Sequence, residues 1–221
     1  METEVKLGFK DKTDLFKVCA GDFFRRHCLE PEDPKPVLLE NKYLDTEDLF
    51  ITKRGGSLRV RHYAGSDEAF YEFTVKYGGG TTGGLHKRLE WNVRSEDGNF
   101  SIASFKNNAS GADSLELLNE VFADITDSDL KIVCSNSFNR TVYELSYGSS
   151  RIEACFDSGV ITSSDGSKTD EICELELELI SGDENDLTVL ADQIKNEADC
   201  MPLCRTKYIR TLAMAIGDEG L

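Results

Sequence analysis

Acidic and basic side chains alternate with other residues in several short segments of this chain. The first segment separates Glu2, Glu4 and Lys6 by Thr3 and Val5. Because successive side chains of a β-strand point to opposite faces, such a segment places its charged groups on one face. The same alternation recurs further along the chain and brings in Arg59, Arg61, Glu72, Lys76, Arg88, Glu90, Arg151, Glu153, Asp157, Glu174, Glu176 and Glu178.

The charged residues form two sets, an acidic set suited to hold a metal ion and a basic set suited to hold an anion. The carboxylates from both ends of the chain would repel one another strongly unless a cation lay among them, and hard oxygen ligands suit Mg²⁺ or Mn²⁺. Arg binds phosphate oxygens in a planar bidentate way, while Lys acts as a mobile point charge. Either type of strand alone is commonly a solvated, salt-bridged face, but the two types together favour a binding site. The acidic set is Glu2, Glu4, Glu174, Glu176 and Glu178, and the basic set is Lys6, Arg59, Arg61, Lys76, Arg88, Arg140 and Lys207.

A sheet closed into a barrel with a charged lumen collects these faces most economically. We therefore predict a mostly β (α+β) fold, a closed barrel of about eight strands in a single domain spanning residues 1–221, whose apolar outer face is covered by amphipathic helices. The Gly-rich run 78–84 is not followed by Lys-Ser/Thr and a helix, and we predict a flexible loop there. Strand patterns lie at 2–9, 37–45, 57–64, 68–77, 86–94, 131–146, 150–162 and 170–181, and helical patterns lie at 11–26, 100–126, 184–199 and 204–216.

Composition narrows the classes of partner. The formal net charge of −16, from 41 acidic and 25 basic residues, argues against nucleic acid or an anionic membrane as the main partner but leaves room for a small anionic ligand. The seven cysteines form no CxxC pair, so we expect reduced thiols and a cytoplasmic location. No signal peptide is visible at the start, and no apolar stretch is long enough to span a bilayer.

The histidines lack metal-ligand spacing. We expect His27 to lie at the surface after the first helix, and His86 to lie near the basic set, exposed or beyond direct contact with a ligand. Nucleophile-elbow, phosphate-loop and dinucleotide-binding motifs are also missing from the sequence.

The order of these motifs resembles that of a known family. Glu2-Thr3-Glu4-Val5-Lys6 resembles the ExExK signature of the CYTH superfamily, also called triphosphate tunnel metalloenzymes. Residues 83–90 resemble the bacterial inorganic triphosphatase branch, and the resemblance covers about residues 2–212. It departs from the family pattern where Thr206 replaces Ser and Tyr208 replaces a small residue. The other similar segments are 43–46 (YxDT), 58–61 (LRxR), 74–76 (TxK), 157–161 (DxGxI), 174–178 (ExExE) and 206–210 (SKxxR).

The resemblance implies a closed, eight-stranded antiparallel tunnel that binds a linear triphosphate with Mg²⁺ or Mn²⁺ and hydrolyses inorganic triphosphate to pyrophosphate and phosphate. Carried over by position, it implies metal ligation by Glu2, Glu4, Asp157, Glu174 and Glu176. It implies phosphate binding by Lys6, Arg59, Arg61, Lys76, Arg88, Arg140 and Lys207, with Glu4, Lys6 and Lys76 in catalytic roles.

Several functions remain open on the same residues. The superfamily tunnel also serves class IV-type adenylyl cyclases and thiamine or nucleoside triphosphatases, and a non-catalytic polyphosphate-binding module is a further alternative. The carboxylates at both ends of the chain weigh against a pure anion binder, which gains nothing from them. Oligomeric state, a homodimer included, is also left open.

Overall fold

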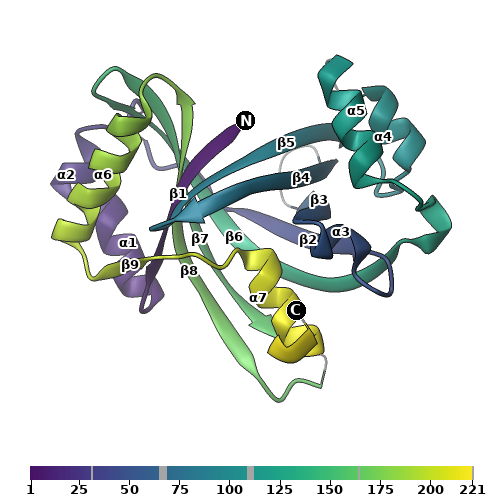
Figure 1. Cartoon of the computed structure of the whole chain (residues 1–221). Helices are drawn as coiled ribbons and strands as arrows, with labels where there is room; N and C mark the ends of the chain where they lie inside the picture. The colour runs from purple at the N-terminus through teal and green to yellow at the C-terminus, as the bar shows by residue number, and fades with distance from the viewer. Residues whose placement is uncertain (31, 65–68, 109–111, 164, 221) are drawn as a thin grey trace.

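The computed structural model describes residues 1–30, 32–64, 69–108, 112–163 and 165–220. Its centre is one antiparallel sheet that closes on itself (Figure 1). The strands lie in the order β5-β4-β3-β2-β6-β7-β8-β1, and β1 pairs with β5 to complete an eight-stranded barrel, which confirms the predicted fold class. The strands are β1 (Glu2–Phe9), β2 (Val37–Asp45), β3 (Gly56–Ala64), β4 (Tyr71–Thr82), β5 (Leu85–Ser95), β6 (Lys131–Tyr147), β7 (Ser150–Thr162) and β8 (Thr169–Ser181), and a short additional strand β9 (Cys200–Pro202) pairs with β1 beyond the end of β5.

The helices follow the predicted patterns with one division and one short helix, Phe50–Lys53, that was not predicted. The Asp11 side chain accepts a hydrogen bond from the Asp14 N–H (3.0 Å) at the start of the first helix, but Gly21 is extended and separates two helices where one was predicted. Residues 109–111, inside the predicted helix 100–126, lie outside the described ranges. The helices are α1 (Lys12–Ala20), α2 (Asp22–Arg25), α3 (Phe50–Lys53), α4 (Ile102–Asn108), α5 (Ala112–Val121), α6 (Glu184–Glu197) and α7 (Lys207–Ile216), with 3₁₀ turns at Asp127–Asp129 and Asp218–Gly220.

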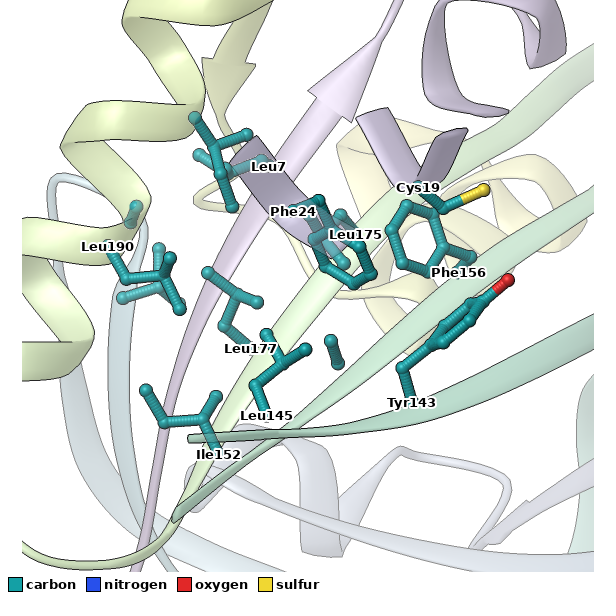
Figure 2. Close-up of a cluster of buried hydrophobic side chains, with 14 of the residues drawn as sticks. Leu7, Cys19, Phe24, Tyr143, Leu145, Ile152, Phe156, Leu175, Leu177 and Leu190 are labelled. Atoms are coloured by element: carbon teal, nitrogen blue, oxygen red, sulfur yellow. The ribbon is translucent and has the colours of Figure 1, made fainter. Parts of the chain in front are cut away.

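The outer face of the barrel is apolar and is covered by helices on two sides. Helices α1, α2 and α6 lie on one side and α4 and α5 on the other (Figure 1). Under the first group, outward residues of β1 and β6 to β8 pack with residues of the helices, as Figure 2 shows for Leu7, Phe24, Phe156, Leu177 and Leu190. The second group covers a separate cluster around Leu58, Phe73, Val75 and Trp91, with Phe105 and Leu118 from the helices. Burial of both clusters leaves the charged faces of the strands pointing into the lumen.

Helix α7 lies in one end of the barrel and does not cover its outer face, so the expectation of outer cover is wrong for this helix. Its Tyr208 and Leu212 pack with Tyr43 and Cys134, and the Asn136 side chain donates a hydrogen bond to the Thr211 hydroxyl (2.7 Å). Beside them, four lumenal apolar residues of the barrel pack with Met214 of the helix: Leu39, Phe138, Ile161 and Ile172. The lumen is therefore apolar at the α7 end and charged beyond it.

The glycine-rich run is a strand hairpin, so the predicted flexible loop at 78–84 is wrong. Strand β4 continues to Thr82, and only Gly83 and Gly84 form the turn to β5. Gly79 has a φ of +81° at a bulge, where a Cβ atom would lie 1.7 Å from the Lys87 carbonyl oxygen. Glycine is needed there because the two backbones approach so closely. The start predicted for this strand, residue 68, lies outside the described ranges, and β4 begins at Tyr71. No helix within those ranges is long and apolar enough to cross a membrane.

Candidate active site

Strand β1 lies in the middle of the charged lumen because both of its edges are paired. On one edge, Glu4 and Lys6 lie opposite Glu178 and Glu176 of β8, and on the other edge Glu2 lies opposite Arg88 of β5. Closure of the barrel thus brings the two ends of the chain together, as the two acidic segments predicted. One cavity of about 60 Å³ is lined by all the basic residues of the predicted site: Lys6, Arg59, Arg61, Lys76, Arg88, Arg140 and Lys207.

At the α7 end of the lumen, Lys207 is surrounded by carboxylates. Its Nζ lies 2.7 Å from both Asp157 and Glu174 and 2.8 Å from Glu176. Burial lowers the pKa of Lys207, but these carboxylates outweigh burial and raise the pKa above its usual value. The Nε and Nη2 of Arg140 donate to the two carboxylate oxygens of Asp157 (2.7 and 2.6 Å), and Nη2 also donates to Glu176 (2.5 Å). Arg210 also pairs with Glu174, so three bases balance the three carboxylates of this cluster.

In the middle of the lumen, Lys6 joins the two acidic strands. Its Nζ donates to Glu4 (2.7 Å) and to Glu176, and Arg88 donates to the other oxygen of Glu4 (3.1 Å). Burial raises the pKa of Glu4, but the ammonium groups of Lys6 and Lys76 outweigh burial and hold that pKa at about 2. Burial also raises the pKa of Glu176, yet Lys207, Lys6 and Arg140 hold it well below the usual range. Both carboxylates are ionised at neutral pH.

At the end of the lumen away from α7, acidic groups outnumber bases. Lys76 lies between Glu2 (2.6 Å) and Glu90 (3.1 Å), and Glu178 forms no ion pair within the described part of the chain. Burial and the neighbouring carboxylates Glu4 and Glu90 raise the pKa of Glu2 to about 7. Burial, followed by Glu2 and Glu90, likewise raises the pKa of Glu178 to about 7. Glu2, Glu90 and Glu178 therefore have fewer positive charges than negative ones around them, and this end of the lumen is called the deficient end.

The predicted metal ligands fall into two groups along the barrel. Glu174 lies opposite Gly8 on β1, six residues from Glu2. At about 3.3 Å per residue, this separation is roughly 20 Å. Glu2 and Glu174 therefore cannot bind one ion, and Asp157 lies opposite Glu174 in the distant group. Among the residues of the deficient end, Glu90 was seen in the sequence only as part of a strand pattern and Glu178 was left out of the implied ligand set. Glu90 alternates with Arg88, and Glu178 alternates with Glu176, so this spacing was the signal in the sequence that places them in the lumen.

Two buried arginine nitrogens point to a missing anion. The Nε atoms of Arg59 and Arg88 are buried and have no hydrogen-bond partner in the described structure. The Arg59 guanidinium donates to the Thr74 hydroxyl (2.9 Å), and the Arg61 Nε donates to the Asn41 side chain (2.8 Å). A buried N–H without a partner is costly, so an oxyanion in this cavity would satisfy groups that the protein leaves unsatisfied.

The donor chemistry of the deficient end fits a divalent cation. Glu2, Glu4, Glu90 and Glu178 supply hard oxygen atoms, and their excess negative charge favours a cation. Within the described ranges, however, no three acidic, cysteine or histidine side chains are already arranged around one point as metal ligands. Lys76 and Lys6 hold some of these oxygens, so a cation would bind by exchanging with the lysines as partners.

His86 does not line the anion cavity, and both of its ring nitrogens are hydrogen-bonded. It is buried, with 1% of its surface exposed, and its ring nitrogens bond to the Thr81 hydroxyl (2.9 Å) and the Leu203 carbonyl oxygen (2.8 Å). Of the placements expected for His86, exposure is wrong, because the side chain points into the closed barrel at the junction of β1, β5 and β9, while a place beyond direct contact with a ligand stays a prediction. His27 is half-buried against Phe23 and Tyr147.

A family model for the CYTH domain matches residues 1–211. The chain belongs to the CYTH domain family. An inorganic triphosphatase from Haemophilus influenzae is 30% identical over 163 residues, which are 74% of this chain and 42% of that protein. The chain therefore spans less than half the length of this relative.

Solved structures of CYTH-like proteins have the same fold. A Hippeastrum protein, HpAC1, assigned as an adenylyl cyclase and described as having a dominant triphosphatase activity, superposes with a TM-score of 0.67 at 15% identity, over 98% of this chain and 97% of that one. A Bacillus halodurans protein assigned as an adenylate cyclase superposes with a TM-score of 0.54 at 18% identity, over 95% of this chain and 98% of that one. At these identities the likeness establishes the barrel fold.

Proposed function

We propose that this CYTH barrel is a metal-dependent hydrolase that splits inorganic triphosphate into pyrophosphate and phosphate inside its lumen. The observation that carries the proposal is a small cavity lined by Lys and Arg from six elements, with two buried guanidinium nitrogens unsatisfied among the described residues. The Haemophilus influenzae relative, named an inorganic triphosphatase, supports the same reaction.

The shape and lining of the cavity favour a bare phosphate chain over a nucleotide. Its volume is about 60 Å³ with the ion pairs in place, and a linear anion can enlarge it by separating Lys and Arg from their carboxylates. Tyr43 and Tyr208 are the aromatic residues of its lining, and they pack on each other with ring centroids 4.7 Å apart. Each ring thus covers one face of the other and leaves less ring surface for stacking on a base.

Basic side chains would bind the phosphates and offset the charge that develops during the reaction. Arg59 and Arg88 bind through N–H groups that now lack partners, while Lys6, Arg140 and Lys207 exchange carboxylate oxygens for phosphate oxygens. Because these groups are held in place by the barrel, little reorganisation is needed when charge moves to the leaving oxygen. Mg²⁺ or Mn²⁺ held by Glu2, Glu4 and Glu178 would supply further neutralisation of the phosphate charge.

The acidic end of the lumen provides groups to place and deprotonate water. The water oxygen attacks the terminal phosphorus, the bond from phosphorus to the bridging oxygen breaks, and pyrophosphate leaves. A carboxylate of this end that does not hold the metal, such as Glu90 beside Lys76 (3.1 Å), would accept the proton of that water.

The test uses two lysines on adjacent strands. Lys76→Ala removes a lumenal ammonium group, and Lys87→Ala removes a lysine that is 42% exposed and pairs with Glu184 outside the lumen. We expect Lys76→Ala and Glu4→Ala to lose tripolyphosphate turnover while keeping the wild-type circular dichroism spectrum, and Lys87→Ala to keep both. Full activity of folded Lys76→Ala would refute the assignment of the lumen as the active site.

A further inference from the structure

We infer that His86 is a positioning residue that fixes the segment leading to Lys207, and so holds the anion site in its binding form. The segment, residues 203–206, connects β9 to α7 and is called the strap below. The inference deepens the proposed function, on which its kinetic readout rests, but its structural readout is independent of catalysis.

The strap crosses the barrel where β1 changes partners. Strand β5 pairs with β1 from Glu2 to Val5, and β9 pairs with it from Leu7 to Phe9. Lys6 lies between these two pairings, where its N–H donates to the Gly84 carbonyl (3.0 Å) and its carbonyl accepts from the Leu203 N–H (2.9 Å). The backbone of a lumenal lysine is thus the attachment point of both the β4–β5 hairpin and the strap.

His86 adds the side-chain bond that ties these two elements together. Its Nε2 lies 2.8 Å from the Leu203 carbonyl, which can only accept, so Nε2 carries the proton. Its Nδ1, 2.9 Å from the Thr81 hydroxyl, accepts from that hydroxyl when the ring is neutral. Both ring nitrogens are therefore satisfied inside the barrel, and the neutral ring joins the hairpin to the strap.

Close packing makes the strap sensitive to small changes beneath it. A Cβ atom on Gly8 would lie 2.8 Å from the Leu203 side chain, and one on Gly84 would lie 2.8 Å from Pro202. The strap then ends at Thr206, whose side chain caps α7, and the next residue is Lys207. Only three residues separate Leu203, whose carbonyl is held by His86, from Lys207, which binds three carboxylates. A shift of the strap is therefore passed directly to Lys207.

The loss of the His86 bond would lower the fraction of molecules with the strap in place. Affinity for a ligand falls by the same factor as the binding-competent fraction, while a saturating ligand restores the competent form. The cost of leaving a buried carbonyl without its donor corresponds to roughly a ten-fold change in that fraction. We therefore expect an effect on KM and on binding, with little effect on kcat.

The experiment compares His86→Leu, which removes both bonds, with His86→Gln, whose amide can still donate to Leu203. Gly8→Ala displaces the strap without changing His86, and Thr81→Val removes only the hydroxyl partner. The structural readout is hydrogen exchange at the Leu203 amide. The functional readouts are the calorimetric affinity for tripolyphosphate with Mg²⁺ and the steady-state constants.

For His86→Leu and Gly8→Ala we expect exchange at Leu203 to be roughly ten-fold faster, with affinity roughly ten-fold weaker and kcat changed less than three-fold. His86→Gln should lie close to wild type. The inference is overturned if His86→Leu leaves Leu203 exchange unchanged, or if it lowers kcat with KM constant, since either result would give His86 a different role. If wild type turns over no triphosphate, the proposed function fails, while the exchange and binding measurements still decide the role of His86.

Discussion

Replacement of Glu178 by Gln is expected to stabilise the metal-free protein and impair its function. Burial and the nearby Glu2 and Glu90 raise the pKa of Glu178 from 4.5 to about 7. A carboxyl with a raised folded-state pKa contributes stability below pH 4.5, and that contribution is lost as the pH rises through 7. Gln has the same shape and does not ionise, so Glu178→Gln should keep the stability that wild type loses.

The size of this effect follows from the pKa difference. The difference between 4.5 and about 7 corresponds to roughly 3 kcal/mol for a fully buried group. Glu178 is only partly buried, so solvent screening reduces the expected gain at pH 8 to about 1–2 kcal/mol. Urea unfolding in EDTA at several pH values measures this gain, with the exposed Glu116→Gln on α5 as the matched control.

Wild type and Glu178→Gln should be equally stable near pH 4 and diverge as the pH rises to 8. Saturating Mg²⁺ should stabilise wild type more than the variant, because a ligand that binds the folded state adds to its stability. Equal stability of the two proteins at pH 8 in EDTA would refute the reasoning that this end of the lumen carries uncompensated negative charge.

Three further perturbations test other parts of the lumen. Arg59→Met should weaken tripolyphosphate binding at least ten-fold by calorimetry and change the urea midpoint little, because the buried Arg59 Nε has no partner in the described structure and only the bonds to Thr74 and Glu72 are lost. Lys207→Met should cost about 2–4 kcal/mol of unfolding free energy at pH 7, since three buried carboxylates lose a shared counter-ion. That cost should shrink only as the pH falls well below 4.5, because the stability that the low pKa of Glu176 contributes above 4.5 is lost as the pH falls through its folded pKa. Mg²⁺ binding should release protons at pH 6.5 and tighten toward pH 8, measured by calorimetry in buffers of different ionisation enthalpy, because Glu2 and Glu178 are partly protonated near 7. A pH-independent affinity would contradict ligation by these carboxylates.

The barrel was predictable because its strands alternate so regularly. Charged residues recur with period two on strands from both ends of the chain, and only closure brings those faces together. The basic set was also predictable, since the residues of β1, β3, β4, β5, β6 and α7 that carry it line one cavity.

Other features depended on contacts that no local pattern contains. The amphipathic pattern of α7 predicts a buried face, but it cannot distinguish the outer wall of the barrel from its lumen, where Tyr208 and Leu212 pack. Similarly, the spacing of Glu174, Glu176 and Glu178 predicts a shared face without saying how far along it Glu2 lies. The register Glu4 to Glu178 supplies this information and divides the carboxylates into a self-neutralised group and a charge-deficient group.

The glycine-rich hairpin and His86 also depend on contacts between segments that no local sequence pattern contains. Gly79 and Gly84 read as flexible in sequence, whereas their close approaches to Lys87 and Pro202 make them fixed parts of the barrel. His86 has no recognisable motif because its partners, Thr81 and Leu203, come from a hairpin and from a segment more than a hundred residues away.

The proposal that the lumen hydrolyses inorganic triphosphate is tested by measuring phosphate release from tripolyphosphate. The purified protein is assayed with Mg²⁺, with Mn²⁺ and with EDTA, and ATP and thiamine triphosphate are tested in parallel. We expect rapid release from tripolyphosphate with either metal, none in EDTA, and much slower turnover of the two larger substrates. Turnover of ATP without turnover of tripolyphosphate would assign a nucleotide enzyme, and no turnover of any of the three would contradict a catalytic role for the lumen.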